Sequence, residues 1–236
     1  MHLSPNFGKG NTATGAFSLV SCYKNTNAAT ASLLFGRENI NNSDGSFSVV
    51  GGYNCSNSGQ ASTIISYTST NTADYATIFG SSNNNSGNNS ILAGRGHQNS
   101  HHDSAIFGAL NTNLQRYSLL AGHYINNNAL GGIAFGFHTN NNSERALVFG
   151  SYNVGRNNTL LEAGWGESDT KRKNVFEVYK DGRAKVYGTP TENNDVLRWQ
   201  EKIALEGNIS ELNSTKFDKS GGTITGNISV TAGNSV

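Results

Sequence analysis

The sequence predicts an all-β protein that consists mainly of a parallel β-solenoid with coils of fourteen residues. Three observations support this prediction. Only 35% of the residues are hydrophobic whereas 28 are glycine, which is too few apolar side chains for a thick globular core. A short element of the form small-apolar-apolar-x-Gly recurs at a fixed period, and the strand it forms is apolar on both faces. Disorder, the other structure that this composition allows, would scatter the apolar residues at random.

We call the last residue of each element its anchor. Ten of the eleven intervals between anchors are fourteen residues, and the interval from Gly36 to Gly52 is sixteen because it contains a two-residue insertion at the turn-like Asn-Ser-Asp-Gly. Small residues, mostly serine, stand four positions before the anchors, and asparagine is frequent shortly after them. Glycine and asparagine tolerate a left-handed backbone, so we expect both at the corners of the coils. The anchors are Gly8, Cys22, Gly36, Gly52, Ser66, Gly80, Gly94, Gly108, Gly122, Gly136, Gly150 and Gly164.

The strand before each anchor predicts an oligomer. Apolar residues stand three and one positions before the anchor, as in Leu33 with Phe35 and Ile133 with Phe135, and also at the position between them. A strand that is apolar on both faces has to be buried on both. The interior of a coil covers one face only, and a second copy of the chain is the simplest cover for the other.

The repeated element resembles the head repeats of YadA-like trimeric adhesins over about residues 4–164. Gly36, Gly80, Gly94, Gly108, Gly122, Gly136 and Gly150 occupy the glycine of that motif, whereas Cys22 and Ser66 depart from it. The resemblance implies a left-handed parallel β-roll, a homotrimer and a role in surface attachment. We expect this roll to span residues 1–166.

Residues 165–236 differ in composition, with 20 charged side chains against 13 in residues 1–164. The alternation in 175–186 around Asp181-Gly182 predicts a β-hairpin within a neck of residues 167–190. Apolar residues at three- and four-residue steps predict a short helix in 191–214. The last segment, 215–236, resembles the shaft repeats of bacteriophage tail fibres, and parts of 175–200 are similar to phage tail proteins. This second resemblance favours a phage protein over a bacterial autotransporter.

Charge and hydropathy exclude several classes of function. A net charge of +1 gives no field that would favour nucleic acid. No apolar run is long enough for a transmembrane helix, and the first residues do not form a signal peptide, so we expect synthesis in a cytoplasm without ordinary secretion. Cys22 and Cys55 lie two coils apart, about 10 Å, which is too far for a disulfide.

The sequence predicts neither an enzyme nor a metal or cofactor site. The histidines His97, His101 and His102 have no ligand-type neighbours in adjacent coils, so we expect them on a plain polar surface. Asp74 and Glu144 share a position in the repeat but lie five coils apart, about 24 Å, which is too far for a glycosidase pair within one chain. Motifs for phosphate, calcium or nucleophilic serine chemistry are absent from the sequence.

Aromatic residues just after the anchors are the candidate binding residues. Tyr124, His138 and Tyr152 share one position in three successive coils and are expected to form a ladder. Phe137 and Trp165 lie one position away, where Tyr53 and Tyr67 form a shorter pair. Exposed aromatic ladders suit the flat apolar faces of sugar rings. The alternative is that these side chains only lock the corners of the roll or the contacts between subunits.

Together these patterns predict a non-enzymatic, homotrimeric phage tail fibre or receptor-binding protein in the virion tail. Its expected partners are further copies of itself, a bacterial surface glycan or protein receptor, and other tail or baseplate proteins, without nucleic acid or membrane insertion. The alternatives are the head of a bacterial trimeric autotransporter adhesin at the cell surface and a polysaccharide depolymerase.

Overall fold

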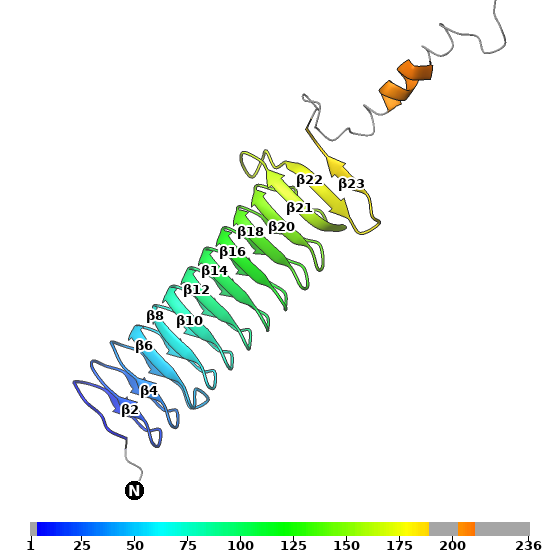
Figure 1. The fold of residues 1–236 in the computed structure, drawn as a ribbon. Helices are drawn as coiled ribbons and strands as arrows, with labels where there is room; N and C mark the ends of the chain where they lie inside the picture. Colours follow the sequence, from blue (N-terminus) through cyan, green and yellow to red (C-terminus); the bar gives the residue numbers. More distant parts are fainter. Residues whose placement is uncertain (1–3, 189–202, 211–236) are drawn as a thin grey trace, which may run out of the picture. The chain divides into compact units, whose positions relative to one another are not determined.

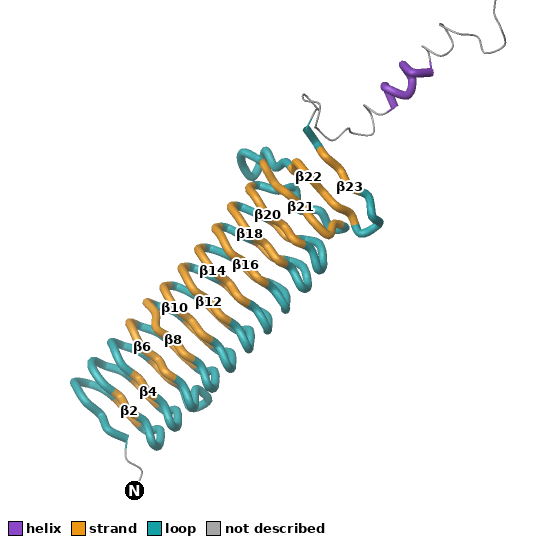
Figure 2. Tube along the Cα trace, viewed as in Figure 1, coloured by secondary structure: helices purple, strands orange, loops and turns teal. Residues whose placement is uncertain are grey.

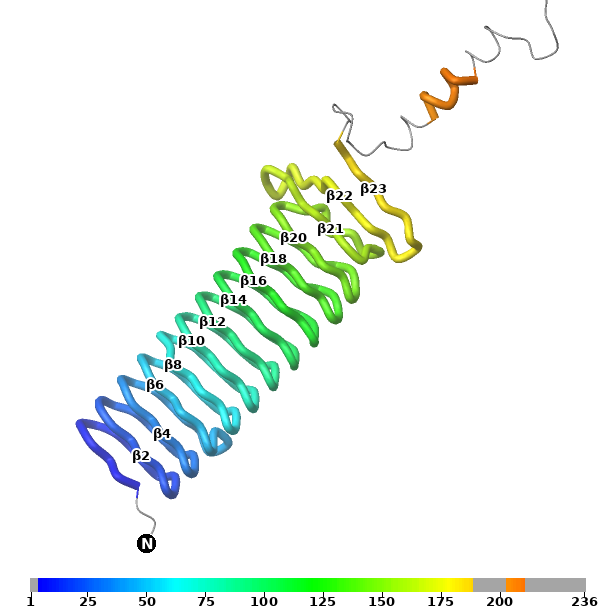
Figure 3. The backbone as a smooth tube through the Cα atoms, viewed as in Figure 1, coloured from blue at the N-terminus to red at the C-terminus, as the bar shows by residue number. Residues whose placement is uncertain are grey.

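The computed structural model describes residues 4–188 and 203–210, which belong to two compact units that divide after Tyr187. In the first unit, parallel strands stack in successive coils (Figures 1 and 3), so the predicted all-β solenoid is confirmed. In the second unit the described residues form a helix at 203–210, inside the segment predicted to be helical. The rest of 191–214 and the shaft-like segment 215–236 lie outside the described residues.

Two sheets run along the solenoid, joined by the corners of each coil (Figure 2). The ten-stranded sheet consists of two-residue strands: β1 Thr12–Ala13, β3 Thr26–Asn27, β5 Ile40–Asn41, β7 Ser56–Asn57, β9 Thr70–Asn71, β11 Asn84–Asn85, β13 Gln98–Asn99, β15 Thr112–Asn113, β17 Asn126–Asn127 and β19 Asn140–Asn141. The thirteen-stranded sheet consists of β2 Leu19–Val20, β4 Leu33–Leu34, β6 Val49–Tyr53, β8 Thr63–Tyr67, β10 Thr77–Ser81, β12 Ile91–Arg95, β14 Ala105–Ala109, β16 Leu119–His123, β18 Ile133–Phe137, β20 Leu147–Ser151, β21 Thr159–Trp165, β22 Asn174–Tyr179 and β23 Ala184–Val186.

The register of the parallel strands follows the repeat. Gly80 lies opposite Gly94, and Gly94 lies opposite Gly108. Across the insertion Leu34 still lies opposite Val50, so the extra residues loop out without shifting the register. The anchor is glycine because a Cβ on Gly80 or Gly94 would come within 2.0 Å of the carbonyl oxygen of the next coil, and because its φ is positive.

The apolar core consists mainly of a column of side chains two positions before the anchors, and Cys55 and Ile125 join it from the position three after them. All of these side chains are fully buried, and they stack on one another through the length of the roll: Val20, Leu34, Val50, Ile64, Ile78, Leu92, Ile106, Leu120, Ala134 and Val148. The residues on either side of them in the strand point outward. Phe79 is 43% exposed and Ile91 is 46% exposed, so in the single chain the second apolar face of the strand is uncovered.

The interior facing this core is lined with asparagine. Nine asparagines, each five positions after an anchor, form what we call the inner amide ladder: Asn27, Asn41, Asn57, Asn71, Asn85, Asn99, Asn113, Asn127 and Asn141. Each is at most 2% exposed. The Nδ2 of each later member donates to the Oδ1 of the one before it, over 2.8–3.0 Å. The ladder satisfies buried amides that would otherwise destabilise the roll.

A second set of asparagines, three positions after the anchors, bonds the corners together. Asn39 donates from Nδ2 to the carbonyls of Phe35 and Gly52, and its backbone N–H donates to Oδ1 of Asn25. The expectation that these asparagines adopt a left-handed backbone is wrong, because none of them has a positive φ. Besides the anchors, the left-handed residues are mostly those two after and five before the anchors, such as Glu38 and Tyr75.

His97 occupies a position of this second set and is fully buried, so its predicted surface location is wrong. Its backbone N–H donates to Asn83 Oδ1, and its Nδ1 accepts the backbone N–H of Asn111 over 3.3 Å. Its Nε2 lies 3.3 Å from the carbonyl oxygen of Ala93, so the neutral ring satisfies both contacts by donating from Nε2. His97 therefore replaces an asparagine inside the structure. His102 is exposed, as expected.

The C-terminal end of the solenoid is closed by Glu162, which stands in the core column. It is fully buried and accepts hydrogen bonds from the backbone N–H groups of Gly155 and Arg156 and from the Thr159 hydroxyl. After it the chain reverses, and β22 pairs antiparallel with β21. The predicted hairpin is present as β22 and β23 around Asp181-Gly182. Cys22 and Cys55 are free thiols.

We expect Asn127→Ala to destabilise the roll by on the order of 3 kcal/mol, because the buried Oδ1 of Asn113 loses its Nδ2 donor and the buried Nδ2 of Asn141 loses its acceptor. The adjacent Asn128→Ala is the matched control, because Asn128 makes an exposed amide contact with Asn142, and it should change the stability by less than about 0.5 kcal/mol. Urea unfolding measures both values. Equal losses in the two variants would contradict a stabilising ladder.

Burial lowers the pKa of His97 from its usual 6.5, so the folded protein favours the neutral ring. The folded state then binds fewer protons than the unfolded chain, and stability should fall as the pH drops below 6.5. Thermal unfolding of wild type, His97→Asn and the exposed control His102→Asn between pH 8 and pH 5 measures this. His97→Asn should lose less stability than wild type over this range, and parallel curves for the three proteins would disprove the assignment.

Candidate functional site

The candidate site is the line of side chains that directly follow the anchors, which we call the corner column. It comprises Lys9, Tyr23, Arg37, Tyr53, Tyr67, Ser81, Arg95, Ala109, His123, Phe137, Ser151 and Trp165. These residues lie at the C-terminal ends of the parallel strands and pair in register, as Tyr53 does with Tyr67 and Arg95 with Ala109. The column therefore runs along one rim of the exposed apolar face.

Three of the predicted aromatic residues, Tyr124, His138 and Tyr152, do form a ladder. The ring of His138 lies 4.6 Å from that of Tyr124 and 4.7 Å from that of Tyr152, measured between centroids. Phe137 joins them, with its centroid 5.4 Å from Tyr152. The sequence reasoning missed His123, which stacks on Phe137 at 5.3 Å. His123 lies fourteen residues before Phe137, so the period itself could have identified it.

Tyr53 and Tyr67 stack as a separate group near the N-terminal end, with centroids 5.1 Å apart. This group extends further than the sequence suggested, because the Arg37 guanidinium lies 5.4 Å from the centroid of Tyr53 and 5.6 Å from that of Tyr23. Tyr23 and Arg37 occupy the same repeat position as Tyr53. The two aromatic groups are separated by Ser81, Arg95 and Ala109.

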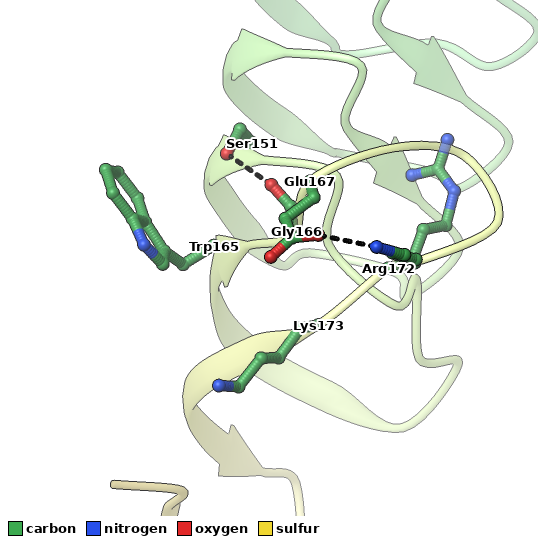
Figure 4. A pocket seen from close by; sticks show the side chains of 7 residues that line it. Ser151, Trp165, Gly166, Glu167, Arg172 and Lys173 are labelled. Atoms are coloured by element: carbon green, nitrogen blue, oxygen red, sulfur yellow. Dashed lines mark hydrogen bonds and ion pairs between the residues drawn. The ribbon is translucent and has the colours of Figure 1, made fainter.

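Trp165 makes no ring contact within the described part of the chain and stands apart from both groups. It is 72% exposed. Its side chain borders a pocket lined by Ser151, Gly166, Glu167 and the basic run 171–173 (Figure 4). The pocket combines an exposed aromatic face with charged and polar groups, mostly basic.

The loop 166–173 fastens the C-terminal aromatic group to the end of the roll. Nη1 of Arg172 donates to the carbonyls of His138 and Asn153, and Nη2 forms an ion pair with Asp169. Asp169 also lies 3.3 Å from Nδ1 of His138. These contacts hold the rings in place before any ligand arrives, which reduces the entropy cost of binding.

The buried carboxylates of Glu162 and Glu177 form a hydrogen-bonded network at this end of the roll. Asn174 donates from Nδ2 to both Glu162 and Glu177, and Arg156 donates to Glu177 from the side. Burial alone would raise the pKa of Glu177, but hydrogen bonds from Tyr179, Tyr187, Asn174 and Arg156 outweigh it and lower the pKa to about 2. Both glutamates are fully buried, so neither can contact a polysaccharide in this conformation.

Other kinds of site find little support in residues 4–188 and 203–210. These residues contain no cluster of three His, Cys, Asp or Glu side chains that could bind a metal ion. No helix among them is long and apolar enough to span a membrane. No protein-family model matches the sequence, and no curated protein is similar to it.

We expect Glu177→Gln to lower the melting temperature at pH 7, because the ionised carboxylate accepts hydrogen bonds that a neutral amide cannot fully replace. The pKa of Glu177 is lower in the folded state, so its contribution is present above pH 4.5 and is lost as the pH falls toward 2. The difference between wild type and variant should shrink over that range. Glu167→Gln, which alters an exposed ion pair with Lys171, is the control, and a difference that persists unchanged at pH 2 would contradict the prediction.

Proposed function

We propose that the protein is a non-enzymatic, homotrimeric phage tail fibre or receptor-binding protein that attaches to glycan on the bacterial surface. The observation that carries this proposal is a regular roll with a continuous uncovered apolar face and an aromatic column along its rim. The face supplies the subunit contact, and the column supplies the attachment surface. In this proposal the roll is left-handed with fourteen-residue coils, and it acts in the virion tail together with other tail or baseplate proteins.

The pattern of side-chain sizes on the apolar face supports a contact between copies of the chain. One position before the anchors, large and small side chains mostly alternate from coil to coil, as in Phe79, Ala93, Phe107 and Ala121. The ring of Phe35 extends over Gly51 in the next coil. A Cβ added to Gly51 would lie only 2.2 Å from Cζ of Phe35, so the ring covers two coils. Filling gaps between layers in this way gives an even surface that a second copy can pack against.

Trimeric assembly also explains how binding sites of low affinity could attach a phage particle to a cell. Three identical chains present three corner columns, so weak contacts at each column add through avidity without any single strong site. Two other functions are alternatives to this proposal: the head of a bacterial trimeric autotransporter adhesin at the cell surface, and a polysaccharide depolymerase. The C-terminal resemblance to tail-fibre shafts favours the phage protein over the autotransporter.

Sedimentation equilibrium tests the assembly. One chain has a mass of 25.1 kDa, so a trimer should sediment at 3 × 25.1 = 75.3 kDa. Phe107→Glu places a charge on the apolar face and should dissociate the trimer. Leu114→Glu is the matched control, because Leu114 is 42% exposed, much like Phe107 at 40%, but follows a strand of the opposite sheet. A wild-type mass of 25 kDa would refute the proposal.

Adsorption of the fluorescently labelled protein to candidate host cells tests the attachment. We expect adsorption that is lost when the cells are treated with periodate, which destroys glycans, and that falls in Tyr124→Ala and Trp165→Ala. Protease treatment of the cells is the control for a protein receptor. Release of reducing sugar from purified capsule would instead establish the depolymerase.

A further inference from the structure

Charged residues are segregated between the two ends of each coil. The corner column and the residues next to it carry four basic side chains, Lys9, Lys24, Arg37 and Arg95, and one acidic side chain, Glu38. The opposite turn has more acidic than basic side chains, with four acidic and three basic ones: Asp44, Asp74, Asp103, Glu144, Arg116, Arg145 and Arg156. The corner is therefore net 4 − 1 = +3 and the opposite turn net 3 − 4 = −1.

Several cations of the column are not neutralised by the protein. Arg37 pairs with Glu38, Lys171 with Glu167, and Arg172 with Asp169. Among the described residues, no carboxylate pairs with Lys9, Lys24, Arg95 or Lys173. Arg95 is exposed and lies between the two aromatic groups, with Ser81 and Ala109 as its small neighbours in the column. The available charges thus alternate with aromatic rings.

Lys173 extends the column at the pocket beside Trp165. The backbone N–H of Trp165 donates to the carbonyl of Lys173 over 2.9 Å, so the two residues lie opposite each other on paired backbone segments. Figure 4 shows both side chains on the same side of the chain, whereas Arg172 points away from them. A flat apolar ring and an unpaired ammonium group therefore border one pocket.

From this arrangement we propose that the corner column binds a linear polysaccharide that carries carboxylate groups on uronate or sialate residues and lies along the roll. Sugar rings stack on the exposed faces of Trp165 and the aromatic groups, while Lys173 and Arg95 each bind a carboxylate. This inference rests on the proposed function, because it specifies the glycan that the attachment surface recognises.

The spacing of the charges favours an acidic polysaccharide over nucleic acid. The unpaired cations Lys24 and Arg95 lie five coils apart, about 24 Å, and Arg95 and Lys173 lie six strands apart, about 29 Å. Single-stranded nucleic acid carries a phosphate on every nucleotide, so most of its charges would stay unpaired here, whereas a polysaccharide can separate its acidic sugars by neutral ones.

Calorimetric titration of the intact trimer tests this inference. The probes are uronate and sialate oligosaccharides, each compared with the same oligosaccharide after its carboxyl groups have been reduced to alcohols. At least one acidic probe should bind roughly tenfold tighter than its reduced form, as expected for a charged hydrogen bond. Lys173→Gln and Arg95→Gln should each remove much of that difference, and Trp165→Ala should weaken both forms. Lys180→Gln, a change at an exposed lysine in the hairpin turn, is the control.

Equal binding of every acidic probe and its reduced form would overturn the inference. Equally tight binding of polyphosphate or single-stranded DNA would also overturn it, because it would show plain attraction to polyanions. The cell-adsorption assay separates this failure from that of the proposed function. Periodate-sensitive adsorption that neutral and acidic oligosaccharides inhibit equally refutes only the acidic ligand, whereas the absence of any adsorption refutes the attachment role itself.

Discussion

The hydrogen bond between the amides of successive asparagines is the constraint on which the rest of the roll depends. A buried amide has to find both a donor and an acceptor, and here each finds them in the coils on either side. The contact fails if one coil shifts by a single residue, because the neighbouring side chain would then face outward. The apolar column stabilises the stack, but hydrophobic contacts are not directional. The amides therefore specify the register.

The insertion before Gly52 shows how strongly this constraint acts. Asn57 still donates to Asn41 over 2.9 Å, although the two asparagines are sixteen residues apart in the sequence. The additional residues leave the coil as a loop instead of moving the amide out of line. The ladder ends differently on its two sides. At the N-terminal side the equivalent position is Ala13, which has no side-chain amide to satisfy. Beyond Asn141 the interior is closed by Glu162, whose carboxylate accepts backbone N–H groups.

The sequence alone was enough to predict the solenoid, the strands and the hairpin, because each follows from a period of hydrophobic residues, but it did not show which apolar face of the strand forms the core. It did not reveal the inner amide ladder, because a buried asparagine and an exposed one look alike in a polar run. In Asn83-Asn84-Asn85 the outer two residues are buried and the middle one is exposed. Only the recurrence of asparagine in nine successive coils marks the ladder. His97 was misplaced for the same reason, since a polar residue near a turn was assumed to face water.

The spacing of the corner column also follows from the ladder and not from attraction between the rings. The aromatic centroids of neighbouring column residues lie 5.1–5.3 Å apart, close to the roughly 4.8 Å between paired strands. Any side chain placed in the column would take this spacing, whether tyrosine, arginine or serine. The interior of each coil is tightly restricted, whereas the column accepts many residue types without loss of fold. Such a surface can change its ligand by substitution within the column while the amides and the apolar core keep the scaffold constant.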